Sequence, residues 1–339
     1  MIDFRYHIVS LISVFLALAV GIALGAGPLK ETIGDSLTGQ VEQLRQDRDA
    51  LRSDLDATEQ TQADQKAYLE AAAPRLLSGA LTDRRVAIVT IGAVDDDSVA
   101  AVTSQLDSAG ATVSAQVEVT DSWTDPSLRS FRQALAGNLV TYLEPAPAES
   151  AGPDVELAEA LIQGLTGADP ASPNELSESA SLILELLAND ESKLITVAEP
   201  VSTPADAVVI LTSSDPEETA TAEGSQDVVA AEVAIASAAQ ARSEGAVVAT
   251  VRSSEGDLVS TILADGDLAQ ELTTVTGVDQ ITGQISIPLA LNARIGTVVG
   301  HYGFGDGETV MPERVTVTAV DRTPAVVPVD PASDVQATG

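Results

Sequence analysis

Residues 85–97 read RVAIVTIGAVDDD, and this short stretch decides the fold expected for most of the chain. Arg85–Ile91 is a run of apolar and β-branched residues, which is typical of a strand buried on both faces. Asp95–Ala109 follows as a predicted helix with an acidic N-cap, and Thr112–Val119 alternates as a second strand. Together they predict a βαβ unit, and therefore a parallel sheet with a right-handed crossover.

The same alternation continues along the chain and predicts an α/β head domain over residues 83–322. Its layout is expected to be an open sheet, Rossmann-like or flavodoxin-like. Further helices are expected at 127–137, 155–166, 174–189 and near 226–241, and further strands at Leu194–Val197, Ala207–Leu211 and Ala246–Val251. The acidic, turn-rich stretch from Ser213 to Asp227 is expected to be a mobile loop. Residues 323–339 contain three prolines and no helical period, and are expected to form a disordered tail.

The N-terminal segment, residues 1–29, is predicted to be a membrane anchor. Residues 8–27 carry no charge, and as a helix of about 30 Å they match the hydrocarbon core of a bilayer. A cleaved signal peptide and a buried core helix are the alternatives, although the run is longer than the usual apolar region of a signal peptide. The single basic Arg5 before the run and the acidic composition of the rest favour a head outside the cytoplasm.

Residues 30–73 are predicted to form a coiled-coil stalk. Apolar residues recur in alternating steps of four and three at Leu37, Val41, Leu44, Leu51 and Leu55, with a charged residue at position 48. The helix is expected to end at Ala73, because the residue before a proline avoids the helical region. A parallel homo-oligomer through the stalk is the preferred interpretation, and an amphipathic helix packed on its own head is the alternative.

The composition excludes several classes of partner. Lys and Arg total 17 against 51 Asp and Glu, which gives a net charge of −34. The negative electrostatic field of such a chain repels nucleic acid and anionic lipid surfaces and attracts cations. The chain has no cysteine, so neither disulfides nor thiolate metal sites are available. Besides lipid around residues 8–27 and a second copy at the stalk, a protein partner in the cell envelope is the remaining expectation.

Two places in the sequence are weak candidates for metal binding. Asp95, Asp96 and Asp97 could hold a hard cation such as Mg²⁺ or Ca²⁺, but the simpler interpretation is that they cap a helix. The same three carboxylates disfavour a nucleotide phosphate at that helix. His301 and Met311 are the other candidates, since His7 lies beside the anchor.

No pattern of catalytic residues is found. Residues 300–307 read GHYGFGDG, but no Lys-Ser/Thr pair follows the glycines, so the segment is not a phosphate-binding loop. It is expected to be a glycine-rich turn packed by Tyr302 and Phe304. No serine lies in a G-x-S-x-G pattern. We therefore expect a protein that is not an enzyme and that has no resident cofactor.

Three segments carry a resemblance to a known family: MIDFRYHIVSLISVFLALAVGIALGAGPL at the N-terminus, RRVAIVTIGAVDDDSVAAV from Arg84, and GHYGFG from Gly300. The chain resembles the mycobacterial copper-transport protein B (MctB) family of actinobacterial envelope proteins over nearly its whole length. The resemblance implies copper transport or efflux across the envelope, with an outer-membrane pore proposed for some members. Relatives are also associated with cell separation and with control of cell-wall cleavage.

Two functional hypotheses follow. The first is a membrane-anchored component of copper transport, in which copper is the transported ion. The second is a non-catalytic envelope scaffold that docks a partner in cell separation or cell-wall cleavage control. Copper(I) prefers thiolate and thioether ligands, and copper(II) prefers imidazole. With no Cys, two Met and two His in the chain, we expect the head to bind copper weakly at most.

Overall fold

The computed structural model describes residues 4–26, 28–148, 150–189, 193–213 and 222–324. The chain divides into two units, residues 1–67 and residues 68–339, and each is described by itself. The first unit is helical. The second contains the end of the long second helix and the α/β head.

Helix α1, Phe4–Ala26, confirms the expected apolar N-terminal helix. Its stretch Phe4–Gly25 has a mean hydropathy of 2.6, and the apolar part of this stretch is not buried against other described residues. By length and composition it is the one helix, among the described residues, that could cross a bilayer.

Helix α2, Pro28–Leu77, runs for 50 residues and covers the predicted stalk. The expected end at Ala73 is wrong, because the helix continues through Pro74 to Leu77. A proline near a helix end removes one hydrogen bond, and here the packing of buried Ala73 and Leu77 holds the last turn in place. The heptad residues at 37, 41, 44, 51 and 55 all stay exposed, by 46–69%.

The head is built on a seven-stranded sheet, in the order β5-β2-β1-β6-β7-β8-β9. All neighbouring strands are parallel except β5, which pairs antiparallel with β2. A separate two-stranded hairpin consists of β3 and β4. The strands are β1 Arg85–Ile91, β2 Thr112–Val119, β3 Ala168–Asp169, β4 Ser172–Leu176, β5 Ile195–Val197, β6 Ala207–Thr212, β7 Ala246–Thr250, β8 Thr273–Thr276 and β9 His301–Tyr302.

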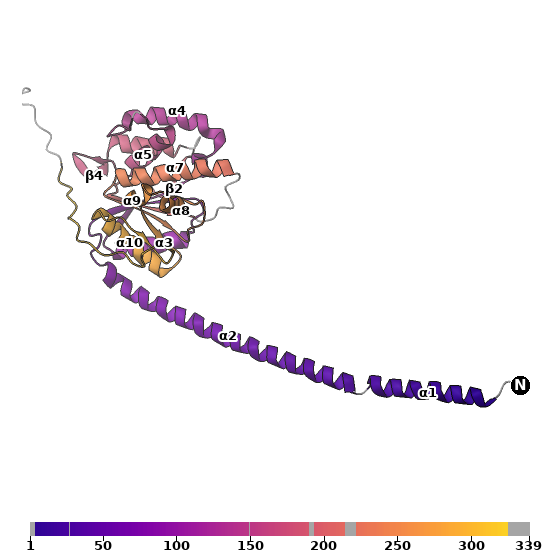
Figure 1. The fold of residues 1–339 in the computed structure, drawn as a ribbon. Coiled ribbons are helices and arrows are strands. Elements are labelled where there is room, and N and C mark those ends of the chain that lie inside the picture. Colours follow the sequence, from indigo (N-terminus) through magenta and orange to yellow (C-terminus); the bar gives the residue numbers. More distant parts are fainter. Residues whose placement is uncertain (1–3, 27, 149, 190–192, 214–221, 325–339) are drawn as a thin grey trace, which may run out of the picture. The chain divides into compact units, whose positions relative to one another are not determined.

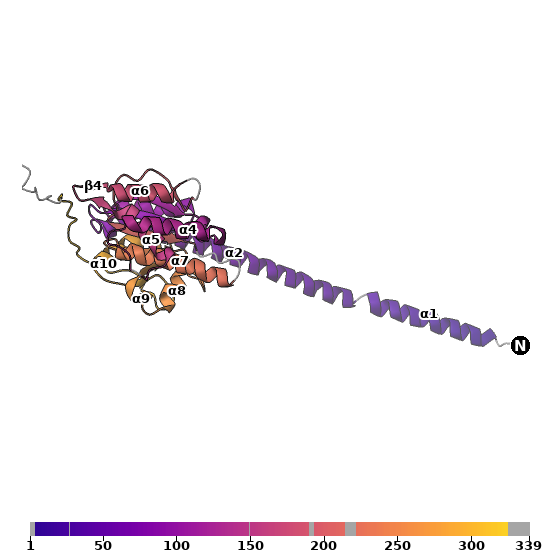
Figure 2. The ribbon, with the colours of Figure 1, turned by 90° about the horizontal axis from the view of Figure 1, so that it is seen from above.

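Helices cover both faces of this sheet. Figure 1 shows α7, α5 and α4 stacked on one face, with α3 and α10 on the other, and Figure 2 shows α6 above α5, and α8 and α9 together at one side. The helices of the head are α3 Asp96–Ser108, α4 Arg129–Leu139, α5 Pro153–Thr166, α6 Glu178–Leu187, α7 Ala222–Ala241, α8 Leu258–Ala264, α9 Leu268–Glu271 and α10 Ile281–Ile295, with 3-10 turns at Asp121–Trp123, Pro126–Leu128 and Val140–Tyr142.

Each face of the sheet has its own apolar core. The first contains Trp123 and the buried sides of α4, α5, α6 and α7. The second contains α3, α10 and the end of α2, including Leu77. Because strands β6 and β7 are buried on both faces, their sequences read as continuous apolar runs rather than as alternating ones.

Most predicted elements are confirmed within a few residues, but two predictions are wrong in part. The helix expected at 174–189 begins only at Glu178, because Ser172–Leu176 pairs as strand β4. The loop expected from Ser213 to Asp227 is helical from Ala222, where α7 begins. Residues 214–221, between these points, lie outside the described residues.

Residues 312–324, which we call the C-terminal strap, run without helix or strand along the head. The strap is fixed by hydrogen bonds to the segment between α2 and β1 and to the residue before β6. Arg322 Nη2 donates to the backbone oxygen of Asp83 at 2.8 Å and to a carboxylate oxygen of Asp206 at 2.5 Å. The tail expected at 323–339 lies outside the described residues from 325 onward.

Candidate functional site

A pocket lies at the carboxyl ends of the central parallel strands. Successive strands are added on one side of β1 and then on the other, so the direction of the sheet order changes between β1 and β6. In open α/β sheets, ligands bind outside the carboxyl ends of the strands at such a point. The pocket has a volume of about 320 Å³ and is lined by Ala93, Val94, Asp95, Ser98, Leu211, Thr212, Ser213, Ala249, Val251, Arg252 and Val278.

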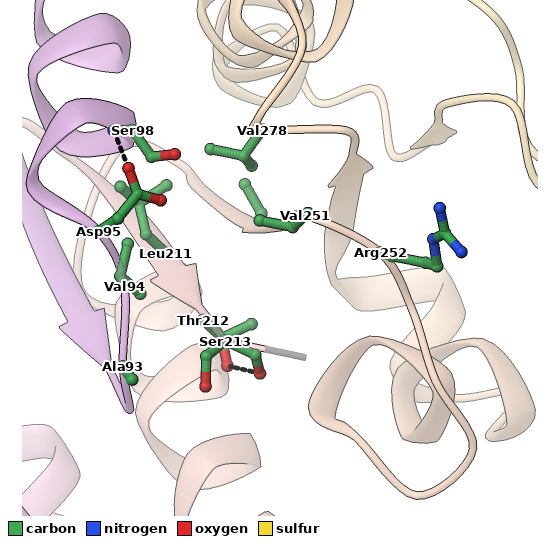
Figure 3. A pocket seen from close by; sticks show the side chains of 11 residues that line it. Ala93, Val94, Asp95, Ser98, Leu211, Thr212, Ser213, Val251, Arg252 and Val278 are labelled. Carbon is green, nitrogen blue, oxygen red and sulfur yellow. Dashed lines mark hydrogen bonds between the residues drawn. The ribbon is translucent and has the colours of Figure 1, made fainter. Parts of the chain in front are cut away.

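The pocket is lined mainly by apolar side chains, with a few polar groups among them. Figure 3 shows the Asp95 and Ser98 side chains on one side, facing Val251 and Val278 across the pocket, while Arg252 points away. Such a site could hold a small molecule with an apolar body and one hydrogen-bonding group.

Asp95 is the N-cap of α3. A carboxylate oxygen of Asp95 accepts a hydrogen bond from the Ser98 backbone nitrogen at 2.8 Å. Hydrogen bonds from Ser98, first from its side chain and then from its backbone, lower the pKa of Asp95. The carboxylate is therefore ionised at neutral pH, and it stabilises the positive end of the helix.

The loop between β1 and α3 depends on a glycine. Gly92 has φ of +73°, in the left-handed region that favours glycine. A Cβ atom at this position would lie 2.7 Å from the Ser213 hydroxyl oxygen, at the end of β6. Gly92 thus lets the loop turn away from β1 while the ends of β1 and β6 stay close together.

The three aspartates do not converge on one point. Asp95 lines the pocket, whereas Asp96 and Asp97 lie exposed in the first turn of α3 and are not among the lining residues. A calcium ion takes six to eight oxygen ligands. Within the described residues there is no group of three or more Asp, Glu, His or Cys side chains that could hold a metal ion.

His301 and Met311 lie near the edge strand β9. The His301 Nδ1 atom is 2.9 Å from the Thr274 hydroxyl, and its Nε2 atom is 3.1 Å from the backbone oxygen of Ala269. Both ring nitrogens therefore already have hydrogen-bond partners in the protein. Met311 is 52% exposed.

The glycine-rich segment at 300–307 is a turn only from Gly303 onward, since His301–Tyr302 forms strand β9, and the expected packing is also wrong in part. Tyr302 is buried, whereas Phe304 is 68% exposed. The turn is instead held by Glu308, whose carboxylate accepts hydrogen bonds from the Gly305 backbone nitrogen at 2.6 Å and from the Thr276 hydroxyl at 2.8 Å. Polar contacts of Glu308 thus do what the aromatic ring of Phe304 was expected to do.

Sequence reasoning identified Asp95 but missed the rest of the pocket. Leu211, Val251 and Val278 come from the ends of β6, β7 and β8, which are far apart in sequence. The available signal was the position of each residue at the end of an apolar strand. Using that signal requires the strand order, which the sequence does not show directly.

Comparisons with known proteins agree over almost the whole chain. The family model described as "Copper transport outer membrane protein, MctB" matches residues 1–312. Proteins named Copper transporter MctB from Mycobacterium bovis and Mycobacterium tuberculosis are each 32% identical over 321 residues, covering 91% of this chain and 98% of the relative. The protein of the same name from Mycobacterium leprae is 28% identical over 320 residues, with the same coverage.

Proposed function

This chain belongs to the MctB family, and we propose that it is a membrane-anchored cell-envelope protein that takes part in copper transport. The observation that carries the proposal is the family match over residues 1–312, which includes the apolar α1 helix, the long α2 helix and all helices and strands of the head. The relatives are named copper transporters, so copper is the ion in this proposal. The apolar helix α1 fits a location in the envelope.

The residues present do not fit tight binding of copper by the chain itself. The sequence has no cysteine, and its soft or imidazole ligands are limited to two Met and two His. His301 uses both ring nitrogens in hydrogen bonds. We therefore place the contribution of this protein in supporting copper passage, through its assembly and its head, rather than in holding the ion. We also propose that the head is not catalytic.

We propose that the head has a flavodoxin-like layout and uses the pocket at its carboxyl edge to bind a ligand. The first five parallel strands in chain order are β1, β2, β6, β7 and β8, and they lie side by side in the order β2-β1-β6-β7-β8. This is the second-first-third-fourth-fifth order of flavodoxin-like sheets, whose ligands bind beside the first strand. The position of the pocket between β1 and β6 supports the same interpretation.

We further propose that α1 spans the membrane once with the head outside the cytoplasm, and that α2 pairs with α2 of a second copy as a parallel coiled coil. The exposed heptad residues, such as Leu44 at 66% and Leu51 at 69%, support the pairing, since it would cover them. Small residues in α1, including Gly21 and Gly25, would allow close helix contact. The outer membrane is the location that the family description suggests.

The scaffold hypothesis, with a role in cell separation, is not favoured by the family match. A strain that lacks the gene for this protein distinguishes the copper-transport proposal from the scaffold hypothesis. If the proposal is right, the strain grown with added copper differs from the parent in cell-associated copper, and the full-length gene restores the parental level. Unchanged copper content and copper tolerance, together with chains of unseparated cells, would overturn the proposal in favour of the scaffold.

A further inference from the structure

A second pocket lies on the helical side of the head that contains α4, α5 and α7. It has a volume of about 310 Å³ and is lined by Trp123, Thr124, Pro126, Arg129, Arg132, Gln133, Pro153, Asp154, Asp227 and Ala231. Helices α4 and α5 begin here, at Arg129 and Pro153. The first turn of a helix carries a partial positive charge, although the Arg129 backbone N–H already donates to Pro126 in the preceding 3-10 turn and Pro153 has no N–H. The pocket therefore combines two guanidinium groups with the first turn of α5.

Two buried hydrogen-bond donors beside this pocket have no acceptor in the described part of the chain. They are Nε1 of Trp123 and Nε of Arg132, in side chains that are 2% and 6% exposed. A buried N–H without an acceptor is costly, and folded proteins rarely keep one without a water or a ligand. Both orphan groups are donors, so the missing group is an acceptor.

The hydrogen bonds of Arg132 show which edge of its guanidinium is open. Nη1 donates to the backbone oxygens of Ser122 at 3.1 Å and Asp125 at 2.6 Å. Nε has no acceptor among the described residues, and both hydrogen bonds that the Arg132 side chain donates to described residues come from Nη1 rather than Nη2. The Nε and Nη2 groups on one side of a guanidinium form the parallel pair that binds the two oxygens of a carboxylate.

Of the two arginines that line the pocket, Arg132 is the one that is not ion-paired with a carboxylate among the described residues. Arg129 is already paired with Asp227 at 2.9 Å, in an ion pair whose side chains are more than half exposed. The guanidinium of Arg132 forms no ion pair with a described carboxylate within 4 Å. Asp154 lies exposed at the rim, near enough to interact electrostatically with Arg132. Asp154 would therefore repel an anion that enters the pocket.

We propose that this pocket binds a small organic carboxylate. Its two oxygens accept from Nε and Nη2 of Arg132, with the indole Nε1 of Trp123 as a neighbouring donor. Its apolar part packs against Pro126, Pro153 and Ala231. A planar pair of donors suits a carboxylate and a phosphate alike, but a carboxylate carries a single charge, and the chain's net charge of −34 disfavours a dianion. This site is separate from the pocket at the end of β1 and does not depend on the role in copper transport.

The test uses the single tryptophan of the chain, which lines the pocket. The full-length protein in detergent is titrated with butyrate, and tryptophan fluorescence is recorded. Butyramide, with nearly the same shape and no charge, is the matched control. The proposal expects a saturable change with butyrate at concentrations where butyramide and chloride have no effect. An equal response to butyrate and butyramide, or no saturable response, would overturn it.

Three variants assign the response to the proposed contacts. Arg132→Gln is expected to weaken butyrate binding about 10-fold or more, since it removes the charged donor pair. Asp154→Asn is expected to tighten binding about 2- to 5-fold by removing the repulsion at the rim. Arg45→Gln, an exposed charge change on α2, should leave binding unchanged. Arg132 also holds the 122–125 turn, so the folding of Arg132→Gln is first checked by circular dichroism. If Arg132→Gln misfolds, Asp154→Asn provides the test of the proposal. Unaltered butyrate affinity in Asp154→Asn would contradict the proposal.

Discussion

The guanidinium of Arg84 lies 2.8 Å from the carboxylate of Glu244, although 160 residues separate them in sequence. The Arg84 side chain is 3% exposed, and its Nη2 also donates to the backbone oxygen of Thr318 in the C-terminal strap. One buried cation therefore joins the segment before β1, the turn before β7 and the strap. Removing its carboxylate partner leaves a buried charge without full compensation.

We expect Glu244→Gln to lower the free energy of unfolding of the head by about 1–3 kcal/mol, reduced from the fully buried case because Glu244 is 37% exposed. Chemical denaturation followed by circular dichroism measures the change. The control is Asp227→Asn, which breaks the exposed ion pair with Arg129 and should cost at most about 1 kcal/mol. Equal losses in the two variants would show that burial of Arg84 does not matter.

Stability should depend on pH through Glu232, a partly buried residue on α7. Burial, and secondarily the charge of Asp257, raises its pKa to about 7 from an ordinary value of 4.5. Between these values the folded protein keeps a proton that the unfolded chain releases, so stability falls as the pH rises from about 4.5 to about 7. The fall is at most about 3 kcal/mol.

Glu232→Gln removes this titration, so the difference in unfolding free energy between the variant and the parent should grow across the same pH range. Denaturant unfolding at several pH values measures it. A constant difference from acid to neutral pH would contradict the raised pKa.

Asp95 should behave as a helix cap. Asp95→Ala is expected to lower the free energy of unfolding by about 1 kcal/mol, while Asp95→Asn, which keeps an accepting oxygen, should cost much less. Thermal or denaturant unfolding compares the two. If added Mg²⁺ or Ca²⁺ stabilises the parent but neither variant, the residue is a cation ligand instead.

Copper should bind the full-length protein weakly. Calorimetric titration with copper(I) or copper(II) is expected to show no stoichiometric site with sub-micromolar affinity, because soft ligands are almost absent. His301→Ala should leave the titration unchanged, since both ring nitrogens are hydrogen-bonded. A tight site that disappears in His301→Ala would show that His301 turns toward the metal.

Pairing of the stalks should depend on the exposed leucines of α2. Leu44→Asp would place a charge between paired helices, at a cost of a few kcal/mol, and should abolish cross-linking in membranes through a cysteine at Val41. The head should remain folded, as judged by protease resistance. Cross-linking that persists in Leu44→Asp would exclude a parallel homodimer through this stripe.

The sequence predicted the first βαβ unit closely because buried strands and capped helices leave local patterns. Strand β8, Thr273–Thr276, was missed because it has only four residues, which is too short for a pattern to be recognised even though threonine and valine favour strands. Helix α10 was missed because it contains Gly283 and Pro288, which normally argue against a helix. In α10, tertiary packing overrides the local preference.

The pocket at the end of β1 was not predicted, and Asp95 was predicted only as a helix cap or a weak metal candidate. Its other walls come from segments near 211, 251 and 278, and their meeting depends on strand order. Periodicity along the chain contains no information on that order. The end of α2 beyond Pro74 and the exposure of Phe304 also depend on contacts with distant residues.

Asn292 is buried, and its side chain donates to the backbone oxygen of Ala80 and accepts from the Val315 backbone nitrogen, each at 2.8 Å. A ribosome makes Ala80 long before Val315. The segment after α2 therefore cannot complete its contacts with Asn292 and the strap until nearly the whole chain has been synthesised. Stalled or truncated chains would emerge with this end of the head open, and quality-control proteases could recognise them there.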